Sequence, residues 1–124
     1  MPLFTDWRAA FALLQPIQNQ IEWYSFLMTQ EKITAENINA PDQLVQVRAD
    51  KYQDMHNAIL KALPDSAPGS TFNEIVETVK IHLSPKLFPD GKSSGWWAKT
   101  VQLDLEAKAQ IIRSNTKPLR FYRA

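Results

Sequence analysis

Apolar residues recur every three or four positions in four stretches of the chain, which is the spacing of one face of an α-helix. The stretches are residues 6–28, 50–63, 71–83 and a fourth that starts at Ser93 or Ser94. The fourth carries two apolar stripes instead of one. A helix with two apolar stripes is contacted from more than one side, so we expect it at the centre of a small domain.

The positions that define these faces are large aliphatic or aromatic residues. In the first stretch they are Trp7, Phe11, Leu14, Ile17, Ile21, Tyr24 and Met28, with Pro16 predicting a kink. In the second and third they are Tyr52, Met55, Ile59, Leu60 and Leu63, then Phe72, Ile75, Val76, Val79 and Leu83. In the fourth the two stripes are Trp97, Val101 and Leu105, and Trp96, Leu103 and Ala107.

Short polar residues predict where these helices begin. Asp50 is expected as the N-cap of the second helix, because its carboxylate can accept hydrogen bonds from the free amides of the first turn. Thr71 and Glu74 have the spacing of a capping box, in which the two side chains satisfy each other's amides. The loop 84–91 is rich in proline and other residues that end helices, and we expect Leu87 and Phe88 to hold it to the core.

Two segments have the character of strands rather than helices. Residues 32–48 predict a loose hairpin or an extended arm, because Val45 and Val47 alternate with polar residues and a Pro-Asp pair forms a turn before them. Residues 111–122 predict a hairpin around the short loop 114–118.

Three helices followed by a terminal hairpin describe an α+β protein of the winged helix-turn-helix class. We therefore predict an N-terminal amphipathic helical arm over residues 1–31 and a winged-helix-like domain over 32–124. The arm is expected to pack on the domain or to pair with a second chain. A start at Met28, which would make residues 1–27 an extension, is left open by the sequence.

Composition restricts the class of protein. The chain has no cysteine, which excludes disulfides, thiolate zinc sites and thiol nucleophiles. No apolar run is long enough for a membrane span, and the N-terminus does not have the pattern of a signal peptide, so we expect a cytoplasmic protein without a membrane partner.

The sequence shows no set of residues with the spacing of a catalytic or metal site. His56 and His82 have no companion at ligand spacing. We expect no enzyme activity, cofactor or metal.

Charge is distributed unevenly, and this favours a nucleic-acid partner. Residues 1–91 have a net charge of −4 and residues 92–124 a net charge of +5. A basic surface on the third helix of the predicted domain and on its terminal hairpin, which is the wing of a winged helix, is typical of double-stranded DNA binding. The candidate DNA-binding residues are Ser93, Ser94, Lys99, Gln102, Arg113, Lys117, Arg120 and Arg123.

A second interpretation involves no DNA. Arg113 and Arg120 could instead pair with acids of residues 1–91, and the lysines could form an ordinary solvated face. Trp96 and Trp97 are both expected in the core, with a base-stacking role as the minor alternative. The Trp-rich helix and the arm could then form a homodimer or a partner interface. An exposed basic face on the helix would favour DNA, and a buried one would favour protein interaction.

One sequence motif resembles a known family. The motif is Gly95-Trp-Trp-Ala-Lys-Thr-Val-Gln-Leu-Asp-Leu-Glu-Ala-Lys108, accompanied by Lys117-Pro-Leu-Arg120, Ala62-Leu-Pro64, Ala67-Pro-Gly69 and Leu87-Phe-Pro89. Over residues 36–123 the chain is similar to an uncharacterised bacterial family, a domain of unknown function. The resemblance implies a winged-helix-like fold and no assigned active site. Family members tend to have Gly after the lysine equivalent to Lys108, so Ala109 and Gln110 predict a slightly longer helix here.

Overall fold

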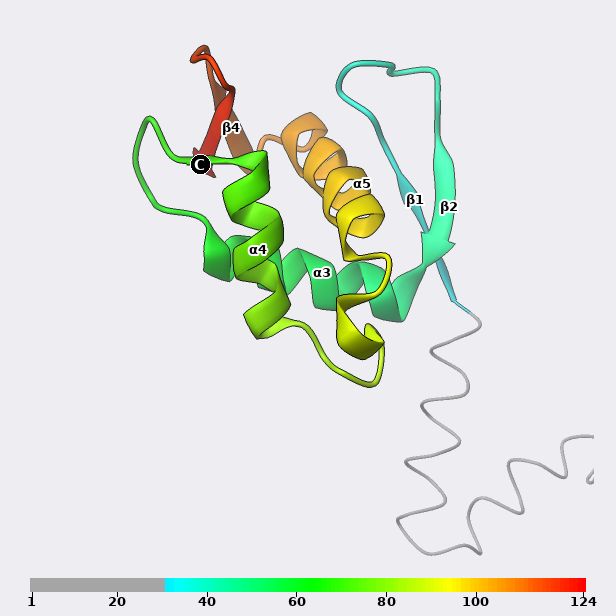
Figure 1. Cartoon of the computed structure of the whole chain (residues 1–124). Coiled ribbons are helices and arrows are strands. Elements are labelled where there is room, and N and C mark those ends of the chain that lie inside the picture. Colours follow the sequence, from blue (N-terminus) through cyan, green and yellow to red (C-terminus); the bar gives the residue numbers. More distant parts are fainter. Residues whose placement is uncertain (1–30) are drawn as a thin grey trace, which may run out of the picture.

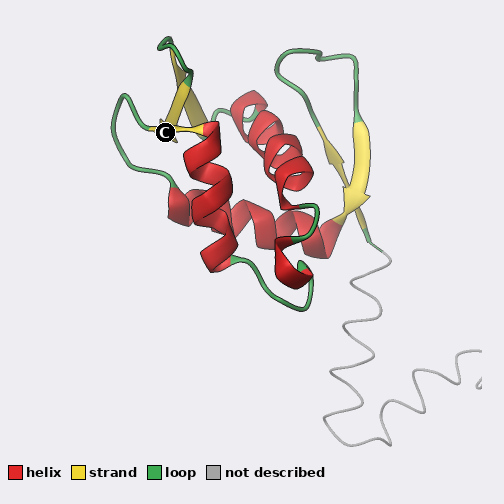
Figure 2. Ribbon diagram, in the orientation of Figure 1, coloured by secondary structure: helices red, strands yellow, loops and turns green. Residues whose placement is uncertain are grey.

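The computed structural model describes residues 31–124, and the segment 6–28, predicted as a helical arm, lies outside them. Three helices form the centre of the described part, with one hairpin before them and another after them (Figures 1 and 2). The protein is therefore α+β, as predicted. The figures show the third helix, α5, lying between the two hairpins.

The first hairpin pairs β1 (Lys32–Ala35) with β2 (Val45–Arg48) in antiparallel register. Ile33 lies opposite Val47, and Ala35 lies opposite Val45, so these four residues share one face. Ala35 and Val47 are buried in the main core. The other face is polar and more exposed, which is the alternation that the sequence predicted for a half-buried hairpin.

The second hairpin belongs to a three-stranded sheet. Strands β4 (Ile111–Ser114) and β5 (Arg120–Arg123) pair as predicted, and the strand order is β3-β5-β4. The added strand, β3 (Ser70–Thr71), was not predicted because two residues show no measurable alternation. Gly69 precedes it with a φ of +92°, and an added Cβ there would lie 1.9 Å from the carbonyl oxygen of Phe121. Only glycine permits this approach of β3 to β5.

The three helices are α3 (Ala49–Ala62), α4 (Phe72–His82) and α5 (Ser94–Ala107), and α3 contacts both of the others. Their predicted apolar faces form one core with both hairpins. Its fully buried large side chains include Met55, Ile59, Leu63, Ile75, Val79, Phe88, Val101, Leu105 and Phe121. Phe88 precedes a short 3-10 helix, η1 (Pro89–Gly91), and holds this loop to the core as predicted.

The predicted helix starts are correct for α4 and wrong for α3. Thr71 and Glu74 form both hydrogen bonds of the capping box, 3.2 Å and 2.9 Å long. In α3, however, the N-cap is Arg48, and Asp50 lies inside the first turn. The reason is that β2 runs into α3 without a loop, so the cap position falls on the last strand residue. Asp50 instead accepts hydrogen bonds from the Arg48 guanidinium and the Lys51 amide.

The prediction that α5 would run longer is also wrong. The helix ends at Ala107, and Ala109 adopts the left-handed conformation with a φ of +60°. The amide of Gln110 donates to the Leu105 carbonyl at 2.9 Å, and the amide of Ala109 donates to Glu106 at 3.0 Å. These two bonds make a Schellman motif, which normally has glycine at the position of Ala109. Ala109 therefore takes the glycine position of this turn, and its left-handed backbone conformation costs conformational free energy.

Candidate functional site

The structure separates the residues that were predicted to contact DNA into two groups. Ser93, Lys99 and Lys117 are exposed, as a DNA contact requires. Ser94 and Gln102 are buried, with Gln102 fully inaccessible, so the prediction that they enter a groove is wrong. Of these five, only Lys99 combines a long polar side chain with an exposed position on α5 itself.

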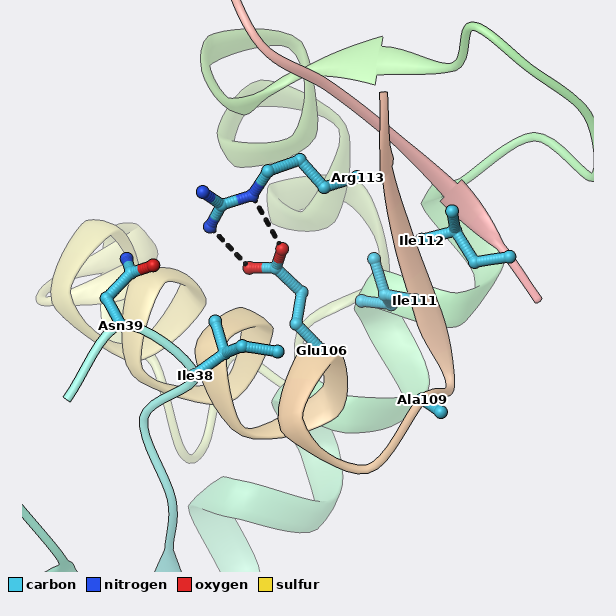
Figure 3. A pocket seen from close by; sticks show the side chains of 7 residues that line it. All are labelled: Ile38, Asn39, Glu106, Ala109, Ile111, Ile112 and Arg113. Carbon is cyan, nitrogen blue, oxygen red and sulfur yellow. Dashed lines mark hydrogen bonds and ion pairs between the residues drawn. The ribbon is translucent and has the colours of Figure 1, made fainter. Parts of the chain in front are cut away.

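Gln102 is buried because it belongs to a polar cluster at the base of the second hairpin. Its amide nitrogen donates to the carboxylate of Glu106, and its Oε1 has no hydrogen-bond partner within the described residues. The guanidinium of Arg113 on β4 donates two parallel hydrogen bonds, of 2.8 Å and 3.0 Å, to the same carboxylate (Figure 3). Hydrogen bonding to Glu106 raises the pKa of Arg113 above its usual value despite burial. The guanidinium therefore fixes β4 to the end of α5.

A second buried carboxylate, Asp104, joins the end of its own helix to two further segments. It accepts hydrogen bonds from the hydroxyl of Tyr52 on α3 and from the ammonium of Lys108 at 2.7 Å. It also accepts one from the backbone amide of Glu36, directly after β1, at 2.8 Å. Burial and the neighbouring carboxylate hold the pKa of Tyr52 well above its usual value. These bonds fasten the first hairpin to α3 and α5.

Most of the C-terminal basic residues are paired rather than free. Arg120 contacts Glu74 at 3.3 Å and Arg123 contacts Asp65 at 2.6 Å. The alternative that Arg120 pairs with an acid of residues 1–91 is thus correct, whereas Arg113 pairs with Glu106 of its own region. Within residues 31–124, the C-terminal cations without an ion pair are Lys92, Lys99 and Lys117.

The two adjacent tryptophans have different environments. Trp97 is buried and meets the edge of Phe88, with ring centroids 6.1 Å apart. Trp96 is 54% exposed, so the expectation that both pack in the core is wrong for this residue. Further along the same stripe, Thr100 and Leu103 line a narrow gap of about 80 Å³ against Ala35 and Val45 of the first hairpin.

This arrangement defines a surface that we call the Trp96 face. Its residues are Leu44, Val45, Trp96, Thr100 and Leu103. Three of them are large apolar side chains in contact with solvent: Leu44, Val45 and Trp96. Ordinary soluble proteins do expose single apolar residues, but here an exposed tryptophan lies one turn of α5 before the gap at Thr100, and two more exposed apolar residues, Leu44 and Val45, lie in the hairpin at that gap, which makes this a candidate interaction surface. The sequence signal was the second apolar stripe of the helix, whose N-terminal end has nothing in the described part to cover it.

A separate cavity of about 370 Å³ lies between the turn after β1 and strand β4 (Figure 3). The paired side chains of Glu106 and Arg113 form its polar part, and aliphatic side chains form most of its wall. Its lining residues are Ile38, Asn39, Glu106, Ala109, Ile111, Ile112 and Arg113.

Residues 31–124 provide no group of three metal-binding side chains, and no helix among them could cross a membrane. No curated protein and no solved structure matches this chain significantly. A family model described as a family of unknown function, DUF6958, matches residues 32–121. The chain therefore belongs to this family of unknown function, DUF6958.

Proposed function

We propose that residues 32–124 form a winged-helix domain. The order of elements supports this, because a helix, a short strand, two further helices and a terminal hairpin follow one another. The strand order β3-β5-β4 also supports it, since the short strand after α3 pairs with the last strand of the hairpin. In such a domain α5 is the recognition helix and the loop between β4 and β5 is the wing.

We further propose that this domain is a non-enzymatic, cytoplasmic protein-interaction module. One observation carries the proposal: the polar residues in the middle of α5 face inward and the apolar Trp96 faces outward. Asp104 and Glu106 accept hydrogen bonds from the two hairpins, and the buried Gln102 donates to Glu106 within the helix. A recognition helix that reads base edges needs long polar side chains on its open side. Here that side offers only Lys99, whose ammonium lies 5.0 Å from the centre of the Phe72 ring.

The partner that fits the Trp96 face is the amphipathic segment 6–28 of a second copy. That segment has an aromatic and aliphatic stripe at helical spacing, beginning with Trp7 and Phe11. Thirty residues precede Glu31, which is enough chain to reach a neighbouring molecule. Burial of an exposed tryptophan against such a stripe gives the hydrophobic centre that stable interfaces contain.

Sedimentation velocity of the full-length protein tests this role. The intact chain should be a dimer, and Trp96→Ser or Phe11→Ser should each shift it toward monomer. Ile81→Ser is the matched control, because Ile81 is an equally apolar residue that is 79% exposed on α4. A monomeric intact chain, or dissociation by the control alone, would contradict the proposal. If Phe11→Ser lowers thermal stability of a monomer instead, the segment packs on its own domain.

Binding of double-stranded DNA is a second candidate function, favoured by the exposed ammonium groups of Lys92, Lys99 and Lys117, which have no ion pair with the other residues of 31–124. Contacts to phosphates release counterions, so the logarithm of affinity falls with the logarithm of salt by about 0.9 for each phosphate. Lys99→Ala and Lys117→Ala together should reduce that slope by up to about two. Replacement of Lys61, an exposed lysine on α3, is the control. No retention of DNA at low salt would exclude this candidate.

A further inference from the structure

The free edge of β4 is the starting observation. Within residues 31–124, β4 lies at the end of the three-stranded sheet and pairs only with β5. An unpaired strand edge presents backbone donors and acceptors that an extended chain can use. The cavity of about 370 Å³ opens beside this strand, between it and the turn that carries Ile38. An added strand would therefore find both a backbone partner and room for a side chain.

The side chains along β4 alternate in chemistry. Ile112 is 39% exposed on the face of β4 that points away from Ile38, and Ile38 across the cavity is 44% exposed, so each offers apolar contact to a ligand. Arg113, the next residue, projects on the opposite face of the strand and lines the cavity. A strand paired with β4 would thus place one residue against isoleucine and the next against a guanidinium.

The charge around β4 indicates which kind of extended chain could pair with this edge. Residues 108–124 contain five cations and no acid. Beside the cavity the ion pair of Arg113 with Glu106 is uneven, because the Arg113 side chain is 28% exposed while its carboxylate partner is 4% exposed. The surface there presents a cation over a buried acid. A second copy of β4 would bring like charges together, which disfavours pairing between two copies.

We propose that the free edge of β4 and the cavity between Ile38 and Arg113 bind an extended acidic peptide that alternates acidic and apolar residues. The peptide adds a fourth strand to the sheet, with its acidic side chains toward Arg113 on the cavity face and its apolar side chains against Ile112 on the opposite face. This is recognition by strand addition, in which the backbone provides affinity and alternate side chains provide selectivity. The surface shares no residue with the Trp96 face, so the two proposals can fail independently.

The test uses the isotopically labelled full-length protein and a short capped peptide of alternating glutamate and valine. Titration followed by NMR should shift the backbone amides of β4 and of the turn around Ile38. The matched peptide that alternates lysine and valine should bind at least about tenfold more weakly. Added salt should weaken binding of the glutamate peptide, because the attraction between exposed charges is screened.

Two variants locate the site, since either one alone could disturb the fold. Ile112→Asp and Ile38→Asp should each weaken binding by about tenfold or more. Ile81→Asp, the same change on α4, should leave affinity unchanged.

Four results would overturn the proposal. The first is no shift at β4, and the second is equal affinity for the lysine peptide. The third is a dependence of the β4 shifts on protein concentration without peptide, which would identify a second copy as the occupant. Displacement of the peptide by duplex DNA, with shifts of the same amides, would assign the edge to nucleic acid instead.

Discussion

The hydroxyl of Tyr52 donates a hydrogen bond to the fully buried carboxylate of Asp104, and this contact joins α3 to α5. A buried carboxylate is stable only when donors surround it. Asp104 has three, from Tyr52, Lys108 and the Glu36 amide. The carboxylate of Asp104 is therefore an organising contact of the core.

Tyr52→Phe should lower the free energy of unfolding by about 2 kcal/mol, because a buried charged acceptor loses one donor while the ring packing is kept. Denaturant unfolding measures the difference. Tyr122→Phe is the control, since Tyr122 is only half-buried and its hydroxyl makes no hydrogen bond within residues 31–124. Equal effects of the two substitutions would show that the bond to Asp104 contributes little.

The same hydroxyl should produce a stability change at alkaline pH. The pKa of Tyr52 is higher in the folded protein than in the unfolded chain, where it is about 10. Its contribution is therefore fully present below pH of about 10 and is lost as pH rises toward the folded pKa. The stability gap between the natural protein and Tyr52→Phe should shrink above that pH. Denaturant unfolding across an alkaline series measures the gap, and a constant gap would contradict the assignment.

Ala109→Gly should stabilise the protein by about 1 kcal/mol. Ala109 holds a φ of +60° at the C-terminal turn of α5, a conformation that glycine adopts without the clash of a Cβ atom. Thermal unfolding provides the measurement. Ala107→Gly, two residues earlier and inside the helix, should instead destabilise by about 1 kcal/mol. A destabilising effect at both positions would mean that the turn gains nothing from glycine.

Gly69→Ala should destabilise the fold by several kcal/mol, on the order of the largest single-substitution effects. The new Cβ would overlap the backbone of Phe121, so β3 would have to separate from β5. Gly95→Ala provides the contrast, because no atom of the part of the chain that the structure describes lies within 4 Å of a Cβ placed there, and alanine favours the helix. Circular dichroism melts of the two variants should move in opposite directions.

Arg113→Met should cost about 3 kcal/mol, because it leaves the buried carboxylate of Glu106 without its main partner. Arg123→Met should cost less than about 1 kcal/mol, since the carboxylate of Asp65 is 82% exposed and water can replace the guanidinium. Denaturant unfolding of both variants compares the two ion pairs. Similar losses would show that burial of the acid does not govern the effect.

Periodicity in the sequence predicted the three helices and the second hairpin, and the spacing of Thr71 and Glu74 predicted the capping box. The first hairpin was one of two alternatives, the other being an extended arm. These features follow from local rules, because each depends on residues close together in the chain. The strand β3 was missed, since its two residues are strand-like only through pairing with β5. The N-cap of α3 was misplaced because nothing local reveals that β2 continues without a loop into the helix.

The candidate site was less predictable for a different reason. Gln102, Asp104 and Glu106 are polar, and polar residues on a helix are normally read as solvent-facing. Their burial depends on donors that come from distant segments, namely Tyr52, Glu36 and Arg113. One local clue existed, because Lys108 follows Asp104 at the i,i+4 spacing of a helical ion pair. The second apolar stripe of α5 was visible in the sequence, but nothing local showed that Trp96, at its N-terminal end, would be exposed.

Three separate segments share the carboxylate of Asp104, and this makes their unfolding mutually dependent. If the first hairpin lifted away alone, the Glu36 amide would leave and a buried charge would lose a donor. A hairpin of two short strands has little stability of its own to offset that loss. The hairpin and the helices should therefore open as one cooperative unit, with amide hydrogens in β1 and α5 exchanging at the rate of global unfolding.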